Sequence, residues 1–216
     1  MNQTEKEKII NRYNTRLNTY GYHPKTLGWD KERHFLRYHV LLDEWLYDND
    51  SLLDFGCGFG DLYNYIKIKK LKIQYSGIDI NDSLVKEGIR NHKGINLKTM
   101  DYLKTATAKK YEYIVASGVH NFKIDDNWNF IKKTFEIFNK TSLKGFAMNF
   151  ISDKCDTFTD HIYHTNPERI LELAYKYSNR VILRNDYMPF EFTIFVNKKI
   201  DFDQNKTVYQ EFLKYC

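Results

Sequence analysis

The sequence predicts an α/β fold in which seven strands form one mostly parallel sheet, doubly wound by helices. Short apolar, β-rich runs alternate with helical patterns, three glycines separate the first run from the next helix, and acidic residues close the first runs. The expected strands are 51–55, 73–79, 95–99, 111–117, 144–150, 180–187 and 190–198. Only Met188 and Pro189 separate the last two runs, which indicates a hairpin.

Before the sheet, residues 1–49 are expected to form a helical lid over a ligand site. A helix is predicted over 30–47, because apolar residues recur there at the spacing of a buried helix face. These residues are Phe35, Tyr38, Leu42 and Trp45. The loop 20–29 is rich in aromatic and turn residues, which suits a segment that closes over a ligand.

The first strand leads into a turn that a ligand can approach closely. Asp54 follows two leucines, and Gly56, Gly58 and Gly60 alternate after it. Glycine has no Cβ atom, so the backbone can adopt positive φ and pass near a ligand. Segment 61–70 has a helical pattern, which places the glycines at a strand-to-helix junction. The alternative is an ordinary tight turn in which Asp54 caps the helix.

A second acidic residue, Asp79, closes the run 73–79 and lies 19 residues beyond Gly60. A carboxylate there can bind both hydroxyls of a ribose, although Asp79 could also merely end its strand. The spacing is shared with nicotinamide-dinucleotide folds. The glycine pattern, however, is Asp-x-Gly-x-Gly-x-Gly rather than Gly-x-Gly-x-x-Gly, and the carboxylate of Asp54 would repel a pyrophosphate.

Two more helices are predicted after the fourth and fifth strands, over 127–140 and 167–178. Asn166 and Pro167 supply a cap and a first-turn proline for the second of them. The apolar stripes are Trp128, Ile131, Phe135 and Phe138 in one helix and Ile170, Leu173, Ala174 and Tyr177 in the other. Open α/β sheets bind ligands at the carboxyl ends of their strands, so the residues that follow the strands are expected to face one site.

These motifs resemble those of the class I, Rossmann-like, S-adenosylmethionine-dependent methyltransferases over residues 50–198. The first motif of that family is Asp/Glu-x-Gly-x-Gly-x-Gly, and its second is an acid that closes strand two, matched here by Asp54 and Asp79. The layout looks most like small stand-alone bacterial enzymes of biosynthetic loci. The resemblance implies an antiparallel last strand, S-adenosyl-L-methionine as the cofactor and S-adenosyl-L-homocysteine as the product.

The resemblance also implies a set of cofactor contacts. Asp54 and the glycines would lie along the methionine part, Asp79 would hold the ribose and Ile80 would pack on the adenine. Asp101, after the third strand, would accept a hydrogen bond from the adenine amino group. The further cofactor-binding candidates are Tyr102, next to Asp101, and Ser117, in the fourth motif at 115–121.

Arg37 is a candidate for the carboxylate of the cofactor. It shares a helix face with Arg33, and a guanidinium can bind a carboxylate with two parallel hydrogen bonds. The alternative is that these arginines face solvent and pair with Glu32 or Asp43.

Methyl transfer to oxygen or nitrogen requires alignment and removal of a proton. His120, after the fourth strand, is the first candidate for the proton acceptor, and His164, in the loop 154–165, is the second. Either histidine could instead serve a hydrogen-bonding or shape role. His161 and His164 with Asp160 could suggest a metal site, but no fourth ligand is evident, so no metal is expected.

The expected acceptor is a small polar metabolite or a surface-glycan or capsule precursor, methylated on oxygen or nitrogen. The fourth motif, 117–120, lacks the two prolines with which nucleobase amino-methyltransferases of the family grip a planar amino group. An RNA or protein methyltransferase remains an alternative. So do a nicotinamide-dependent oxidoreductase and a non-catalytic nucleoside-binding protein.

The length of 216 residues fits one structural domain, divided into the lid region 1–49, a cofactor-binding core 50–200 and a helical tail 201–216. The tail could pack on the sheet or on a second subunit, which leaves a monomer or a homodimer open. The formal charge of +5 is spread along the chain, so nucleic acid is not the expected partner. No apolar run approaches the length of a membrane span and no signal peptide is evident, so we expect a cytoplasmic protein.

Overall fold

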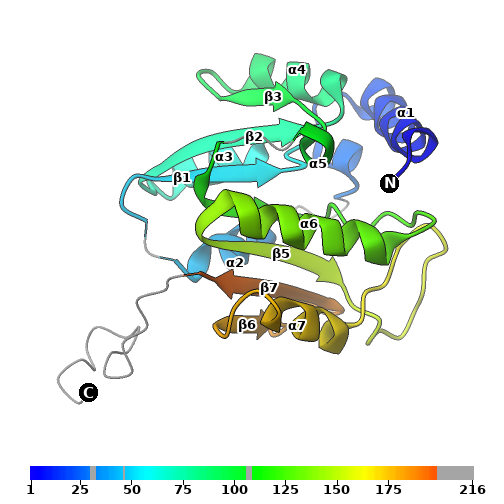
Figure 1. Cartoon of the computed structure of the whole chain (residues 1–216). Helices are drawn as coiled ribbons and strands as arrows, with labels where there is room; N and C mark the ends of the chain where they lie inside the picture. The colour runs from blue at the N-terminus through cyan, green and yellow to red at the C-terminus, as the bar shows by residue number, and fades with distance from the viewer. Residues whose placement is uncertain (30–32, 46, 106–108, 199–216) are drawn as a thin grey trace.

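The computed structural model describes residues 1–29, 33–45, 47–105 and 109–198. Its centre is a seven-stranded sheet in the order β3-β2-β1-β4-β5-β7-β6 (Figure 1). The strands are β1 (Asp50–Phe55), β2 (Ile73–Asp79), β3 (Leu97–Thr99), β4 (Tyr111–Ala116), β5 (Ser142–Ile151), β6 (Val181–Arg184) and β7 (Glu191–Asn197). The predicted seven-stranded α/β sheet is confirmed.

The pairing of the strands places a ligand site next to β1. β1 pairs in parallel with β2 on one side and with β4 on the other. The strands that follow β1 are therefore added first on one side of it, as β2 and β3, and then on its other side, beginning with β4. In open α/β sheets, ligands bind outside the carboxyl ends of the strands at such a reversal. β7 runs antiparallel to both β5 and β6, which confirms the expected hairpin and antiparallel last strand.

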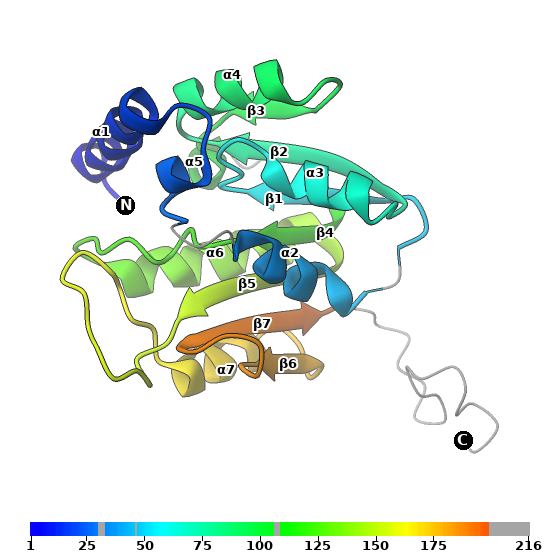
Figure 2. The ribbon, with the colours of Figure 1, turned by 180° about the vertical axis from the view of Figure 1, so that it is seen from behind.

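Helices cover both faces of the sheet. α6 (Asn127–Thr141) and α7 (Pro167–Tyr175) lie on the face toward the viewer in Figure 1, and α2 (His34–Asp43) and α3 (Asp61–Ile68) lie on the face seen in Figure 2. Each face has its own apolar core. Phe135 and Phe138 of α6 belong to one core, whereas Leu41 of α2 and Leu62 of α3 belong to the other, and all four side chains are fully buried.

The remaining helices were not expected as such. They are α1 (Gln3–Tyr20), the short 3₁₀ helix η1 (Pro24–Leu27), α4 (Asp82–Asn91) and α5 (Tyr102–Thr105). The helix predicted over 30–47 corresponds to the shorter α2, and residues 30–32 and 46 lie outside the described residues. The tail 201–216 also lies outside them. None of the described helices is long and apolar enough to cross a membrane.

α4 packs directly on the glycine turn through Gly88. A Cβ atom at this position would lie 2.2 Å from the backbone oxygen of Phe59, so the helix and the turn touch backbone to backbone. We expect Gly88→Ala to lower the free energy of unfolding by about 1–3 kcal/mol, although alanine is the better helix former. Urea unfolding measures the change.

The matched control for Gly88 is its exposed neighbour in α4, Ile89→Ala. The Ile89 side chain is 50% exposed, so its truncation should change the unfolding free energy by no more than about 0.5 kcal/mol. Equal stability of Gly88→Ala and the wild type would contradict the close packing of α4 on the turn.

Candidate functional site

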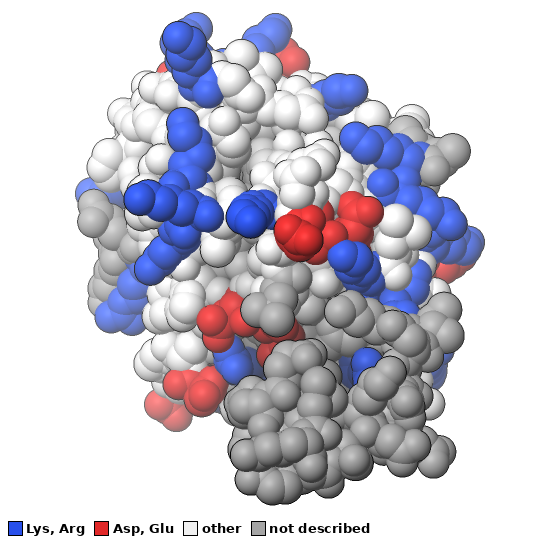
Figure 3. All heavy atoms as spheres, turned by 90° about the vertical axis from the view of Figure 1, so that its left-hand side faces the viewer, with Lys and Arg blue, Asp and Glu red and all other residues white. Residues whose placement is uncertain are grey.

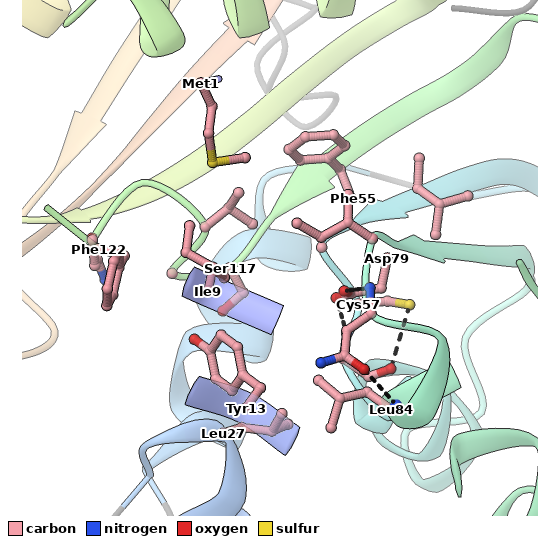
Figure 4. Close-up of a pocket in the computed structure, with 18 of the residues that line it drawn as sticks. Met1, Ile9, Tyr13, Leu27, Phe55, Cys57, Asp79, Leu84, Ser117 and Phe122 are labelled. Atoms are coloured by element: carbon pink, nitrogen blue, oxygen red, sulfur yellow. Dashed lines mark hydrogen bonds between the residues drawn. The ribbon is translucent and has the colours of Figure 1, made fainter. Parts of the chain in front are cut away.

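A cavity of about 490 Å³ lies at the carboxyl ends of the parallel strands and is covered by α1 (Figures 1 and 4). The strand ends supply residues 54–58, 78–81, 100–104 and 117–119 to its lining. α1 supplies Lys6, Ile9, Arg12 and Tyr13, Met1 precedes this helix, and the segment after η1 adds Gly28 and Trp29. Figure 4 shows Ile9, Tyr13 and Leu27 on one side of the cavity and Cys57, Asp79 and Leu84 on the other.

The glycine turn after β1 forms one wall of the cavity. Gly56 and Gly58 line it with φ of 70° and 55°, and a Cβ atom at Gly56 would lie 2.4 Å from Cγ2 of Val119. Gly60 has a φ of 79° but does not line the cavity; a Cβ atom there would lie 2.5 Å from Cδ1 of Ile95. Gly60 is therefore required by the packing of the turn, whereas Gly56 and Gly58 present backbone to a ligand.

Asp54 is buried in the wall of the cavity and accepts a hydrogen bond of 2.8 Å from the hydroxyl of Tyr75. Burial raises the pKa of its carboxyl to about 7; the Tyr75 hydrogen bond opposes this shift, and the negative charge of Asp79 adds to it. A carboxyl with this pKa is poised to lose its proton when a positive charge binds nearby.

Asp79 ends β2 and is held rigidly by two backbone groups. The N–H of Gly58 donates to Oδ2 at 2.9 Å, and the N–H of Asn81 donates to Oδ1 at 2.8 Å. Burial raises the pKa of this carboxyl, while these backbone hydrogen bonds lower it. Each oxygen retains a second lone pair that can accept a hydrogen bond from a ligand.

The other predicted cofactor residues also line the cavity. Ile80 is half-buried and Tyr102 is buried. Asp101 forms an ion pair with Lys6 of α1, a partner that was not foreseen. The hydroxyl oxygen of Ser117 lies 3.4 Å from Nδ2 of Asn149, which donates to it. The structure thus brings all of these positions to the carboxyl edge of the sheet.

Arg37 lines the cavity and is paired with a carboxylate of the protein. Its Nε donates to Oε2 of Glu191 at 2.5 Å, and a second nitrogen binds the other carboxylate oxygen, so its guanidinium already binds a carboxylate in the bidentate manner. The guanidinium also stacks 4.0 Å from the ring centroid of Trp29. Asp43, one of the two partners considered, pairs with Arg184, and Glu32 lies outside the described residues. Arg37 supports Trp29 at the wall of the cavity.

The structure does not bring His120 or His164 to the lining of the cavity. His120 is buried between the rings of Phe130 and Phe150, and its Nε2 lies 3.2 Å from the hydroxyl of Thr134. Burial lowers its pKa to about 3, so it is a poor proton acceptor at neutral pH. His164 packs against Phe158. The expectation that these two histidines face the acceptor is corrected, and the histidine in the lining is His161.

α1 lies in the region 1–49, which was expected to form a helical lid, but the sequence analysis did not specify it as a helix. It begins with a capping box, in which Asn2 accepts from the N–H of Glu5 and Glu5 accepts from the N–H of Asn2. Glu5 also accepts from the N–H of Asp125, and Asn81 donates to the backbone oxygen of Ile10. The Asn-x-x-Glu pattern at residues 2–5 was the available signal for this helix.

The comparisons with known proteins agree with this arrangement. No family model matches the chain. It is 31% identical over 159 residues to Rv1506c of Mycobacterium tuberculosis, a protein whose name assigns it to the methyltransferases, and the match covers 70% of this chain and 95% of that protein. The chain belongs to the methyltransferase family.

Solved methyltransferase structures share the fold. Magnesium protoporphyrin IX methyltransferase from Synechocystis PCC 6803, solved with bound S-adenosylmethionine, superposes with a TM-score of 0.64 at 14% identity over 89% of this chain and 96% of that one. The N-methyltransferase NodS from Bradyrhizobium japonicum WM9, solved with S-adenosylhomocysteine, gives 0.63 at 13% identity over 88% and 99%. The Rossmann-like architecture of this methyltransferase is therefore that of its family.

The described residues include no group of three or more His, Cys, Asp or Glu side chains arranged to hold a metal ion. Asp160, His161 and His164 are thus not gathered into such a group. The acidic residues that the structure does gather are those at the ends of β1, β2 and β3.

Proposed function

We propose that this methyltransferase binds S-adenosylmethionine in the cavity under α1 and transfers its methyl group to a small-molecule acceptor. The observation that carries the proposal is that Asp54, Asp79 and Asp101, from the ends of three neighbouring strands, line one cavity together with the glycine turn. These carboxylates can accept hydrogen bonds from ribose hydroxyls and can face a positively charged group of a ligand.

Each of these residues would contact a different part of the cofactor. Asp79, with its fixed carboxylate, would accept from the two ribose hydroxyls, and Asp54 would face the positive charge of the methionine part. Ile80 and Tyr102 would pack on the adenine, beside Asp101. When bound, the cofactor supplies a methyl group already activated by positive sulfur, so the protein has to bind, align and exclude water.

The acceptor we propose is a small polar metabolite or a surface-glycan or capsule precursor. The support is that α1 and the segments after β4 and β5 enclose the cavity on the side away from Asp79. RNA and protein acceptors remain the alternative. Because the chain belongs to the methyltransferase family, the alternative function of a nicotinamide-dependent oxidoreductase is excluded.

Calorimetric titration with S-adenosylhomocysteine tests the cofactor assignment. We expect a dissociation constant in the micromolar range, on the order of −8 kcal/mol of binding free energy, and no binding of NADH as the control ligand. Absence of S-adenosylhomocysteine binding, or a preference for NADH, would overturn the assignment.

The raised pKa of Asp54 predicts a pH dependence of cofactor affinity. If the carboxylate form binds the ammonium group that S-adenosylmethionine and S-adenosylhomocysteine share, the affinity for S-adenosylhomocysteine should rise as the pH passes through about 7, the pKa of Asp54. The ionised fraction rises from about a tenth at pH 6 to about nine tenths at pH 8, so we expect about tenfold tighter binding at pH 8.

The control for this dependence is Asp54→Asn, which keeps the size of the side chain and removes its titration. Its affinity for S-adenosylhomocysteine should be weak and nearly constant between pH 6 and 8. A wild-type affinity that does not change over this range would exclude Asp54 as the titrating contact. Calorimetry at three pH values distinguishes the two results.

A further inference from the structure

The charges around the cavity are divided between its two sides. The acidic residues of the described lining are Asp54, Asp79 and Asp101, and all three lie at the ends of β1, β2 and β3. The opposite side is built by residues that follow β4 and β5, together with the middle of α1. Figure 4 shows this separation, with Phe122 across the cavity from Asp79. We call the region around Phe122 the acceptor side.

The charged residues of the acceptor side are basic. Arg12 of α1, Lys133 of α6 and His161 line the cavity there. No described carboxylate forms an ion pair with Arg12 or Lys133. The other lining cations are paired: Lys6 and Lys104 with Asp101, and Arg37 with Glu191. The cofactor acids and the acceptor-side cations are thus segregated within one cavity.

The walls between these cations are apolar. Phe122 and Ile162 pair as an isolated antiparallel bridge, and Ile124 and Ile151 line the cavity with them. The guanidinium of Arg12 lies 5.6 Å from the ring centroid of Phe122, so the cation sits directly against the apolar wall. A charged ligand group at Arg12 would therefore place its attached carbon skeleton on that wall.

Basic side chains also lie outside the cavity. Figure 3 looks onto the edge where the parallel strands begin, opposite the cavity, and shows basic side chains in separate groups with acidic side chains between two of them. Two lysines there are paired, Lys144 with Asp50 and Lys140 with Glu136.

We propose that the methyl acceptor is an amphipathic anion, whose carboxylate or phosphate group binds Arg12 while its apolar part lies against Phe122. The inference rests on the proposed function, since it assigns the acceptor of the same cavity. Arginine favours such groups because its planar fork of donors matches their oxygen atoms. Lys133 adds positive charge to the same side. An acceptor without a negative group would form no ion pair with Arg12 or Lys133.

The test uses 2-naphthoate and its neutral isostere 2-naphthamide as probes, titrated by fluorescence into the protein with and without saturating S-adenosylhomocysteine. We expect the naphthoate to bind at least fivefold more tightly than the amide. In Arg12→Gln the ratio of the two affinities should fall to about one, because the amide loses no charge contact.

Lys8→Gln is the matched control, since Lys8 is exposed one turn earlier on α1, lies outside the cavity and carries the same charge. It should keep the wild-type ratio. Equal affinity of the two probes for the wild type, no naphthoate binding, or an unchanged ratio in Arg12→Gln would overturn the proposal. Failure of S-adenosylhomocysteine to bind would instead contradict the cofactor assignment. The titration of the two naphthalene probes in the absence of S-adenosylhomocysteine would still test the anionic acceptor.

Discussion

Replacing Asp79 by alanine is expected to weaken S-adenosylhomocysteine binding by about 100-fold or more. The carboxylate is fixed by the N–H groups of Gly58 and Asn81, so its free lone pairs are already oriented toward the cavity. Loss of two hydrogen bonds to a charged acceptor costs about 3 kcal/mol or more, which corresponds to this factor. Calorimetric titration of the variant gives the dissociation constant directly.

Asp82→Ala is the control for this experiment. Asp82 is three residues further along, is largely exposed, and pairs with Lys86 outside the cavity. Its replacement should leave the affinity within about twofold of the wild type. Thermal unfolding of both variants shows whether the turn remains intact without the Asp79 carboxylate. A folded Asp79→Ala protein with wild-type affinity would contradict the ribose assignment.

Replacing Glu191 by alanine is expected to lower the free energy of unfolding by about 3–5 kcal/mol. Glu191 and Arg37 are 7% and 8% exposed, and they join β7 to α2 by two hydrogen bonds. The variant would leave a buried guanidinium without its counter-ion, which is among the most costly defects in a folded protein. Urea unfolding at neutral pH measures the loss.

A double variant separates the two contributions to this loss. Arg37→Met combined with Glu191→Met replaces the buried pair by apolar side chains, and should recover most of the stability because no unpaired charge remains. Glu168→Ala, which breaks an exposed pair with Lys154, should cost no more than about 1 kcal/mol. If Glu191→Ala were as mild as Glu168→Ala, the Arg37 pair would contribute little to the fold.

The strands could be predicted because the central ones are buried on both faces. β4 was expected at 111–117 and occupies Tyr111–Ala116, where five of the six residues are buried. β6, expected at 180–187, is shorter, Val181–Arg184, and is a half-buried edge strand. α1 escaped prediction because its buried residues are the polar Glu5 and Lys6, so it lacks the apolar stripe of a core helix.

The positions of the candidate site could be predicted better than its side-chain contacts. Strand direction places residues at one edge of the sheet, which suffices for the acids that end β1, β2 and β3. It does not determine which way a side chain turns in the loop beyond. His120 follows β4 as expected but turns into the apolar core against Phe130 and Phe150. Likewise, the choice of Glu191 as the partner of Arg37 joins residues 154 positions apart in the sequence, and no local pattern reveals it.

The attachment of α1 has a consequence for turnover. Its contacts with the core include polar bonds from Glu5, Lys6 and Ile10 to residues that surround the cavity, with little apolar surface from its own buried positions. Lys6 occupies Asp101, the carboxylate proposed to meet the adenine, so the arriving cofactor competes with an internal cation. If Asp101 binds the adenine amino group as proposed, loading of the cofactor would replace the Lys6 contact, and its release would restore that contact. The attachment of α1 to the core would then weaken and re-form in each catalytic cycle.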